Sequence, residues 1–312
     1  MNQRKCIGQS FRVLDINIEG ISKSKSEFLS KLCIENAVDV ILVQETHTVN
    51  AEELNKRGKV AGYQVVAAEF HSKYGIATYV RQGIKNIAAL TSQKVVDIFQ
   101  SAVKINGITF VNLYKPPNVA WPNTMIETFE HPSVYIGDFN SHASDWGYNN
   151  DDNNGEKLKM WASFNELKLI YDPKQRGTFH SARWDQDYNP DLCFVSCNDN
   201  GIPLGITRHV LNGFPNSQHR PIIFEIGLSI PVVQSVRRPR WNFNKARWSD
   251  YSKELDRVIG VIPPKPENYN RFVGLLVSIG KKHIPRGFRK EYIPCWQEDA
   301  DRLYEEFKES GD

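Results

Sequence analysis

Polar residues stand at the tips of several apolar segments, and together their types suit hydrolysis of a phosphate ester. Burying one such group costs on the order of several kcal/mol unless it is paired. If these side chains converge, they can satisfy one another and a metal ion. The positions are Asn17, Glu19, Glu45, Tyr114, Asp138, Asn140, Asp191, Gln218 and His219.

Each residue type has a task in that chemistry. Carboxylate and amide oxygens suit a hard cation such as Mg²⁺. His219 can move a proton near neutral pH, and Asp191 can hold its imidazole in one tautomer. Asn17, Tyr114 and Asn140 offer neutral donors to phosphate oxygens. Any one of these residues alone is better explained as a turn or surface residue, so the prediction depends on their joint occurrence.

Strands and helices alternate over the first 230 residues. Asn106-Gly107 indicates a hairpin. Hairpins combined with helical crossovers predict two mixed sheets packed face to face, with helices outside. Strands are expected at 11–18, 38–45, 63–70, 75–81, 101–106, 108–114, 133–139, 191–196 and 219–228, and helices at 24–37 and 155–170.

The character of the sequence changes near residue 230. We expect a catalytic domain at 1–230, a basic linker at 231–247 and a helical extension at 248–312. Residues 1–234 carry 23 Lys and Arg against 24 Asp and Glu, whereas residues 235–312 carry 16 against 12. The basic stretch from Arg237 and Arg238 to Trp248 could grip phosphates and stack bases, or be a solvated linker.

Composition narrows the class of protein. With 312 residues, of which 40% are hydrophobic, the chain can bury a substantial core. No apolar run approaches a membrane span, and the first ten residues lack an apolar signal region. The five cysteines form no CxxC pair, which favours reduced thiols. We therefore expect an intracellular protein with no membrane partner.

Four motifs in this order resemble the endonuclease/exonuclease/phosphatase superfamily: VQETH at 43–47, NLYKPP at 112–117, GDFN at 137–140 and SQHRPI at 217–222. The similarity covers roughly residues 10–230. GDFNSHASDWG and the later RPRWNFNKARW resemble the endonuclease domain of jockey-like non-LTR, or LINE-type, retrotransposons. In those proteins a reverse transcriptase follows, and the remaining residues are too few to hold one.

The resemblance implies a fold and a set of roles. The fold is a four-layer α/β/β/α sandwich of the deoxyribonuclease I type, here with a C-terminal helical extension. Glu45 is the principal Mg²⁺ ligand, with Asn17 close by, and Mn²⁺ is a possible substitute. Asp138 and Asn140 position the attacking water and the phosphate, which Tyr114 contacts. His219, oriented by Asp191, transfers a proton, although either His219 or Asp138 could be the base.

Two positions depart from the family pattern. Gln218 stands where an Asp usually precedes the final His, and Glu19 stands where many relatives have Asp. Both are expected near the metal, with Gln218 weakening its binding. DNA contacts are expected from loops at 115–124, 143–155 and 205–217, the last as a protruding turn or hairpin. Individual candidates are His142, Arg208 and His209.

The expected function is target-site nicking of DNA for target-primed reverse transcription. It would leave 3′-hydroxyl and 5′-phosphate ends and act in the nucleus on chromosomal DNA. Element RNA is a partner only within a larger polyprotein. An abasic-site repair nuclease or another phosphoesterase remains open, as does an inactive nucleic-acid-binding remnant. No charge is evident inside a core strand, which favours an active enzyme.

Overall fold

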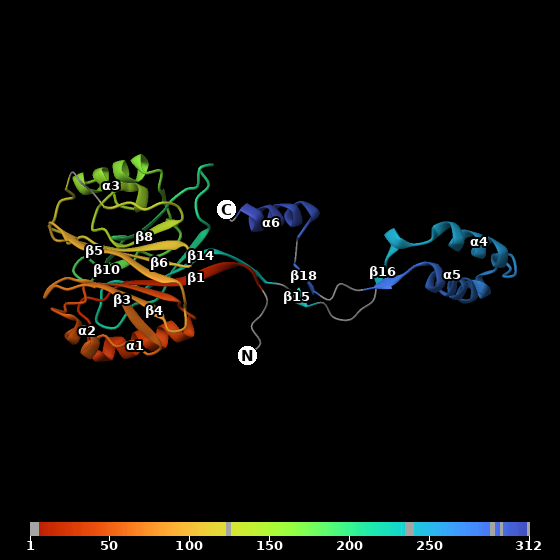
Figure 1. Cartoon of the computed structure of the whole chain (residues 1–312), viewed down its shortest axis with the longest axis horizontal. Coiled ribbons are helices and arrows are strands. Elements are labelled where there is room, and N and C mark those ends of the chain that lie inside the picture. The colour runs from red at the N-terminus through yellow and green to blue at the C-terminus, as the bar shows by residue number, and fades with distance from the viewer. Residues whose placement is uncertain are drawn as a thin grey trace. The chain divides into compact units, whose positions relative to one another are not determined.

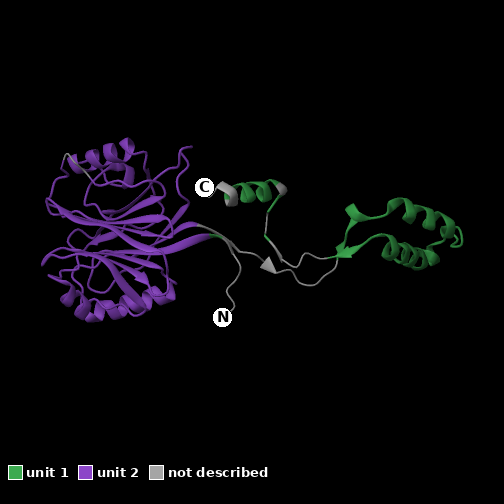
Figure 2. Ribbon diagram, in the orientation of Figure 1, with its two compact units in different colours: residues 1–8, 229–312 green, residues 9–228 purple. Residues whose placement is uncertain are grey.

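The computed structural model describes residues 6–122, 126–231, 233–234, 240–287, 291–293 and 296–310. Arg237 and Arg238 of the expected linker lie outside the described residues, as do positions 123–124 of one expected DNA loop. The chain divides into two units (Figure 2). One is residues 9–228, and the other combines residues 1–8 with residues 229–312.

Two six-stranded sheets form residues 9–228. The first has the order β13-β14-β1-β2-β4-β3 and the second β5-β6-β7-β8-β12-β9. The strands of the first sheet are β1 (Cys6–Asn17), β2 (Val40–Gln44), β3 (Tyr63–Glu69), β4 (Ile76–Arg81), β13 (Ile206–Val210) and β14 (Ile222–Pro231). Those of the second are β5 (Ile87–Val95), β6 (Ile98–Ile105), β7 (Ile108–Tyr114), β8 (Ser133–Asp138), β9 (Lys168–Leu169) and β12 (Asp191–Val195).

Three apolar layers hold this unit together, as a four-layer sandwich requires. One lies between the sheets, where Val13 of β1 and Ile136 of β8 pack. Helices α1 (Lys23–Glu35) and α2 (Ala51–Arg57) cover the outer face of the first sheet, and α3 (Asn153–Phe164) covers the second (Figure 1). The predicted α/β/β/α sandwich is confirmed.

Each helix of the sandwich begins at a side-chain cap. Ser22, Asn50 and Asp152 accept hydrogen bonds from the backbone N–H groups of the first turns of α1, α2 and α3. Such caps satisfy donors that have no partner within the helix. The caps therefore fix the N-terminal ends of all three helices.

The expected helical extension consists of three helices in the described residues of the second unit: α4 (Trp248–Ile259), α5 (Tyr269–His283) and α6 (Glu298–Ser310). Short strands accompany them, with β15 (Val233–Gln234) pairing β18 (Glu291–Tyr292), and β16 (Arg240–Trp241) pairing β17 (Arg286–Gly287). Residues 240–247, expected in the linker, thus carry β16 and a 3-10 turn at Phe243–Lys245. No helix in the described part of the chain has the length and apolarity needed to cross a membrane.

Candidate active site

Strand alternation places the predicted polar residues between the two sheets. Along β8, Val134 and Ile136 face the inner core, so Asp138 faces the same way at the strand end. Pairing then aligns the neighbours, because Asp138 lies opposite Tyr114 of β7 and opposite Asp191 of β12. Three adjacent strands of the second sheet therefore deliver three polar side chains to one end of the sandwich.

Glu45 follows β2 in the opposing sheet, and its carboxylate oxygens contact three polar side chains. Its Oε1 accepts hydrogen bonds from Tyr114 Oη at 2.7 Å and Asn17 Nδ2 at 3.0 Å, and its Oε2 lies 3.2 Å from His47 Nε2. Burial alone would raise the pKa of Glu45, but these hydrogen bonds outweigh it and lower the pKa. The carboxyl is therefore an anion near neutral pH, as a metal ligand must be.

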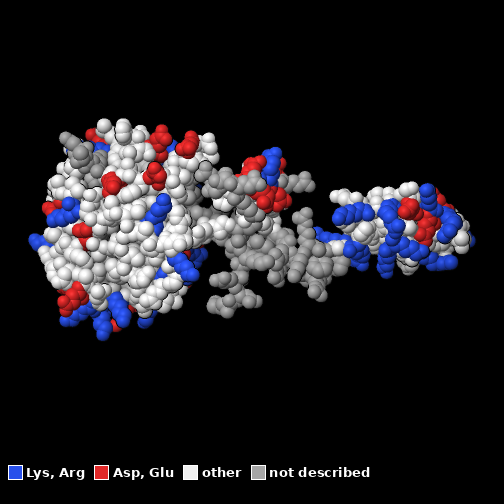
Figure 3. Space-filling model, viewed as in Figure 1, with Lys and Arg blue, Asp and Glu red and all other residues white. Residues whose placement is uncertain are grey.

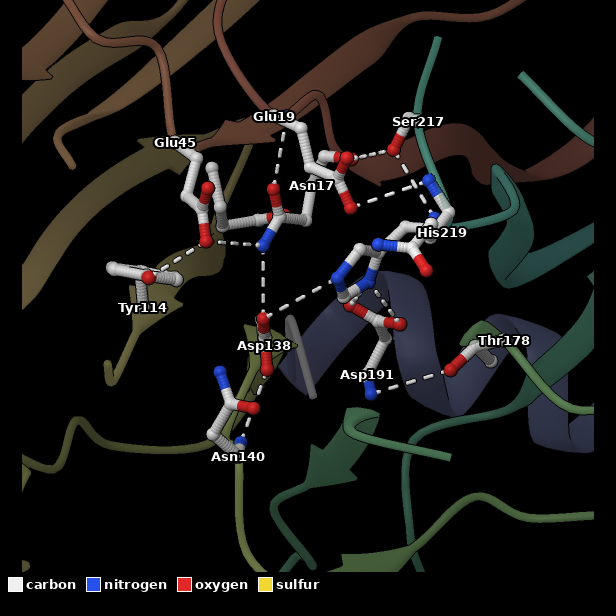
Figure 4. Close-up of polar contacts among 12 residues, drawn as sticks. Asn17, Glu19, Glu45, Tyr114, Asp138, Asn140, Thr178, Asp191, Ser217 and His219 are labelled. Carbon is white, nitrogen blue, oxygen red and sulfur yellow. Dashed lines mark hydrogen bonds and ion pairs between the residues drawn. The ribbon is translucent and has the colours of Figure 1, made fainter. Parts of the chain in front are cut away.

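Asn17 joins the two halves of the site. Its Nδ2 also donates to Asp138 Oδ2 at 2.9 Å, so one amide bridges Glu45 and Asp138 (Figure 4). Its Oδ1 accepts from the backbone N–H of Glu19 at 3.1 Å. Asn17 is completely buried. The side-chain oxygen of Asn17 therefore holds the loop that follows β1, and its nitrogen lies between the two carboxylates.

His219 and Asp191 form a buried pair beside Asp138. His219 Nδ1 lies 2.9 and 3.1 Å from the two oxygens of Asp191, and His219 Nε2 lies 3.9 Å from Asp138 Oδ2. The backbone of the pair is also fixed, because Ser217 Oγ accepts from His219 N–H and Thr178 Oγ1 accepts from Asp191 N–H. Nδ1 thus faces its carboxylate, and Nε2 is presented to Asp138 (Figure 4).

Their surroundings raise the pKa values of both His219 and Asp138. Burial by itself lowers the pKa of His219, but the charge and hydrogen bonds of Asp191 outweigh it and raise the pKa to about 9. Burial raises the pKa of Asp138 above the usual carboxyl range, and the charge of Asp191 adds to the effect. The imidazole is therefore cationic at neutral pH, and Asp138 exchanges its proton at a higher pH than an exposed carboxyl does.

The two departures from the family pattern behave differently. Glu19 lines the cleft, and its Oε1 accepts from the backbone N–H of Gln218 at 3.2 Å. The side chain of Gln218 turns elsewhere, because its Oε1 accepts from Ala182 N–H at 3.1 Å. Its assignment as a metal ligand stays a prediction, and in this conformation its amide oxygen anchors a neighbouring hairpin.

The loop after Asp138 shapes the floor of the site. Asn140 has a φ of 41°, its N–H donates to Asp138 Oδ1, and its Nδ2 donates to the backbone oxygen of Lys115. Asn140 lines the cleft, whereas Tyr114 is fully buried and reaches Glu45. Asn140 therefore faces the cleft, where its contact with a phosphate stays a prediction, and the described contact of Tyr114 is with the predicted metal ligand.

A cleft of about 650 Å³ opens over these groups. Glu45, Asp138 and His219 line it. Aromatic side chains line it as well, and these are Tyr148, Phe179, Trp184 and Tyr188. The ring of His142 stacks on Tyr148 with a centroid separation of 4.2 Å, which places His142 at the cleft wall.

Sequence reasoning missed the hairpin that carries part of this wall. Strands β10 (Phe179–Ser181) and β11 (Gln186–Tyr188) pair, and Trp184 in their turn is 63% exposed. The sequence indicates this hairpin only weakly, because the turn at 182–185 joins two strands of only three residues each. His47 was missed as well, although it stands two residues after Glu45.

Within the segment 205–217, expected as a protruding turn or hairpin, residues 206–210 form strand β13, which pairs antiparallel with β14. Val210 of this strand packs in the inner core. Arg208 is only 9% exposed and lies over the ring of Tyr171. His209 is exposed on the opposite face of the strand. Neither residue lines the cleft, so a DNA contact from them stays a prediction.

A buried polar layer lies beneath the site. Gln44 Nε2 donates to Asp15 Oδ1 and Asn112 Oδ1, both at 2.8 Å. Asp15 is 1% exposed, and burial raises its pKa well above the usual carboxyl range. The expectation of no charge inside a core strand overlooked Asp15, an ionisable residue of β1. Asp15 is tolerated because burial favours its neutral form and Gln44 is a hydrogen-bond partner.

The donor atoms fit a divalent cation. Asp138, Asp191 and His219 each offer a ligand atom within 4.8 Å of the others. Both oxygens of Asp191 already contact His219, so the carboxylates that line the cleft are those of Glu19, Asp138 and the ionised Glu45. Oxygen donors of this kind suit hard cations such as Mg²⁺.

Comparison with known proteins agrees with this geometry. Residues 108–223 match the family described as endonuclease-reverse transcriptase. None of the curated proteins matches the chain.

Solved structures match the catalytic unit at low identity. The endonuclease domain of TRAS1, a telomere-specific non-LTR retrotransposon, is 19% identical with a TM-score of 0.53, over 70% of this chain and 99% of that one. An AP endonuclease from Leishmania major is 14% identical with a TM-score of 0.54, over 70% and 88%. D. rerio TDP2, complexed with a single-strand DNA product, is 12% identical with a TM-score of 0.50, over 70% and 100%.

At these identities the structural likeness establishes the fold. Taken with the family match, it confirms the resemblance to the endonuclease/exonuclease/phosphatase superfamily. The description of the matching family, endonuclease-reverse transcriptase, agrees with the expected enzyme class, a metal-dependent phosphodiesterase.

Proposed function

We propose that this chain, an endonuclease/exonuclease/phosphatase-superfamily nuclease by its fold and family match, is a Mg²⁺-dependent endonuclease that nicks DNA. The observation that carries the proposal is one hydrogen-bonded site in which Asn17 bridges Glu45 to Asp138, with His219 and Asp191 beside them. A chain that had lost its activity would not be required to keep this set intact.

The reaction is in-line attack of water on a phosphodiester. The bond from phosphorus to O3′ breaks, so the products are a 3′-hydroxyl and a 5′-phosphate. Asp138 accepts the proton of the water, because its raised pKa makes it a stronger base than an exposed carboxyl. Cationic His219 faces the phosphate oxygens through Nε2, since Asp191 occupies its Nδ1.

Glu45 is the principal residue that would hold the metal ion, with Asp138 across the bridge formed by Asn17. When bound, Mg²⁺ supplies positive charge that stabilises the phosphate and the leaving oxygen, and Mn²⁺ can substitute for it. Asn140 positions the phosphate at the mouth of the cleft. Tyr114 acts through Glu45, whose carboxylate it holds at 2.7 Å.

The biological role we propose is target-site nicking, in which the new 3′-hydroxyl primes reverse transcription. The family match and the fold shared with a retrotransposon endonuclease domain support this role. It places the activity on chromosomal DNA in the nucleus. Element RNA becomes a partner only if the chain belongs to a larger polyprotein.

The product ends test this assignment directly. Plasmid nicked by the protein should be resealed by DNA ligase alone, because a 3′-hydroxyl and a 5′-phosphate are the ends that ligase joins. Nicks that need prior treatment with a kinase or a phosphatase would contradict the proposed direction of bond cleavage.

Abasic-site cleavage is a second candidate function, favoured by the aromatic wall of the cleft. Phe179, Trp184 and Tyr188 could line the space for an extrahelical sugar, which such enzymes require. The comparison is between matched duplexes with and without one abasic site. A rate at least about a hundredfold higher at the abasic site would favour a repair nuclease, whereas similar rates favour target-site nicking.

A further inference from the structure

Residues 240–287 form a closed helical hairpin within the second unit. Strands β16 and β17 pair at its base, where Asn242 N–H also donates to the Pro285 oxygen at 2.8 Å. Helices α4 and α5 are linked by Glu254, whose oxygens meet Lys282 and His283. The segment is therefore a folded element in its own right and more than a connector.

The helical hairpin is strongly basic. It holds ten Lys and Arg against four Asp and Glu, whereas residues 288–312 hold four against eight. All ten cations are exposed, and Figure 3 shows Lys and Arg side chains over the visible face of α4 and α5. They are Arg240, Lys245, Arg247, Lys253, Arg257, Lys265, Arg271, Lys281, Lys282 and Arg286. Among these cations, Arg247 pairs with Asp250 and Lys282 with Glu254.

Large aromatic side chains are exposed among these cations. Phe243 is 55% exposed, Trp248 49% and Tyr269 68%. Phe243 and Trp248 stack on each other with centroids 5.9 Å apart and planes 17° from parallel. Lys245 and Arg247 lie between them in the sequence. Ring faces interleaved with cations are the combination that binds unpaired bases and their phosphates.

We propose that the α4–α5 hairpin, residues 240–287, binds single-stranded nucleic acid. Charge complementarity favours a polyanion, because ten exposed cations outnumber four acids. The exposed rings favour a single strand over a duplex, because a duplex keeps its base faces stacked inside. RNA and single-stranded DNA share this chemistry, so both belong in the test. The residues proposed to bind the single strand are not those of the nuclease site, so this proposal does not depend on nuclease activity.

The stacking component is tested with the full chain by fluorescence anisotropy in EDTA, which suppresses cleavage. The probes are labelled oligo(dT) and oligo(U) of about 20 nucleotides, long enough for one binding site, and a duplex of the same length. Phe243→Ala with Trp248→Ala should weaken binding of one or both single strands by about tenfold or more and duplex binding far less. The matched control is Phe164→Ala on α3, whose ring is 88% exposed.

The charge component is tested by the salt dependence of the same binding. Lys253→Ala with Arg257→Ala should lower the slope of log K against log salt by up to about 1.4, at ~0.7 per phosphate contact. Lys59→Ala with Lys85→Ala, exposed cations of the nuclease unit, should leave it unchanged. If circular dichroism shows that the aromatic variant loses helix, the charge variant decides. Unchanged single-strand binding in folded variants, or an equal loss of duplex binding in the aromatic variant, would overturn the proposal.

Discussion

Replacing Asp191 by Asn removes the charge that holds His219 cationic. The carboxylate lies 2.9 and 3.1 Å from Nδ1 in a site where both side chains are nearly inaccessible. Two unit charges about 4 Å apart at an effective dielectric constant of about 20 interact by ~4 kcal/mol. That energy corresponds to about three pKa units. Without it, burial should take the pKa of His219 from about 9 to below its ordinary value.

The catalytic loss should be large because the variant alters both the charge and the tautomer of the imidazole. Loss of the orienting carboxylate from a catalytic triad lowers kcat by about 10⁴, and we expect about 10³ or more here. The assays are plasmid nicking at saturating Mg²⁺ and NMR titration of the His219 imidazole. Glu254→Gln, which removes the charge beside His283 at 2.6 Å, is the matched control and should nick normally.

Stability gives an independent readout of the same pair. The folded pKa of His219 is raised, so its contribution is complete below the unfolded value near 6.5 and is lost as the pH rises through about 9. The wild type should therefore lose stability over this window more steeply than Asp191→Asn. A folded Asp191→Asn variant that nicks within tenfold of the wild type, with an unchanged His219 titration, would refute the reasoning.

Three further predictions concern pH, metal and backbone. The pH profile of kcat/KM should be bell-shaped. It should rise as Asp138 loses its proton, at a pH above the usual carboxyl range, and fall as His219 loses its proton near pH 9. A profile that is flat from about pH 5 to 9 would contradict this. Gln218→Ala should change the Mg²⁺ midpoint of nicking by less than about threefold, because its side chain bonds the hairpin; a metal titration checks it. Gly137→Ala should cost at least about 3 kcal/mol in urea unfolding, since its Cβ would lie 1.9 Å from a backbone oxygen of β7, whereas Gly83→Ala, with open space around it, should cost about 1 kcal/mol.

The sandwich could be predicted from the sequence because successive residues of its core strands alternate between two apolar layers. Val13 and Leu14 belong to different apolar layers, as a strand between two packed faces demands. The same alternation made Asp138 and Asp191 recognisable, because each is a polar residue at the end of a buried run. Where the pattern was long and regular, the expected element is present.

The features that the sequence did not predict are those fixed by contacts between residues distant in the sequence. The β10–β11 hairpin has only three residues in each strand, and its place depends on the bond from Ala182 to Gln218. The direction of the Gln218 side chain could not be predicted for the same reason. Asp15 was overlooked because its partner, Gln44, is 29 residues away on the neighbouring strand.

The basic C-terminal region shows another limit of sequence reading. Counting residues 235–312 together gives a modest excess, because the acidic residues of 288–312 offset the cations of 240–287. The division became visible only when β16 and β17 closed the α4–α5 hairpin. The net charge of residues 235–312 as a whole thus hides a charge difference that follows the fold.

The most direct test of the central claim is conversion of supercoiled plasmid to open circles in Mg²⁺. The comparison is wild type against Glu45→Gln, which keeps the size of the side chain and removes its charge, and against His219→Ala. We expect open circles with the wild type, none with EDTA, and a loss of nicking rate of at least about 10³-fold in both variants. Persistent nicking by folded Glu45→Gln and His219→Ala proteins, or no nicking by the folded wild type with ample Mg²⁺ or Mn²⁺, would contradict it.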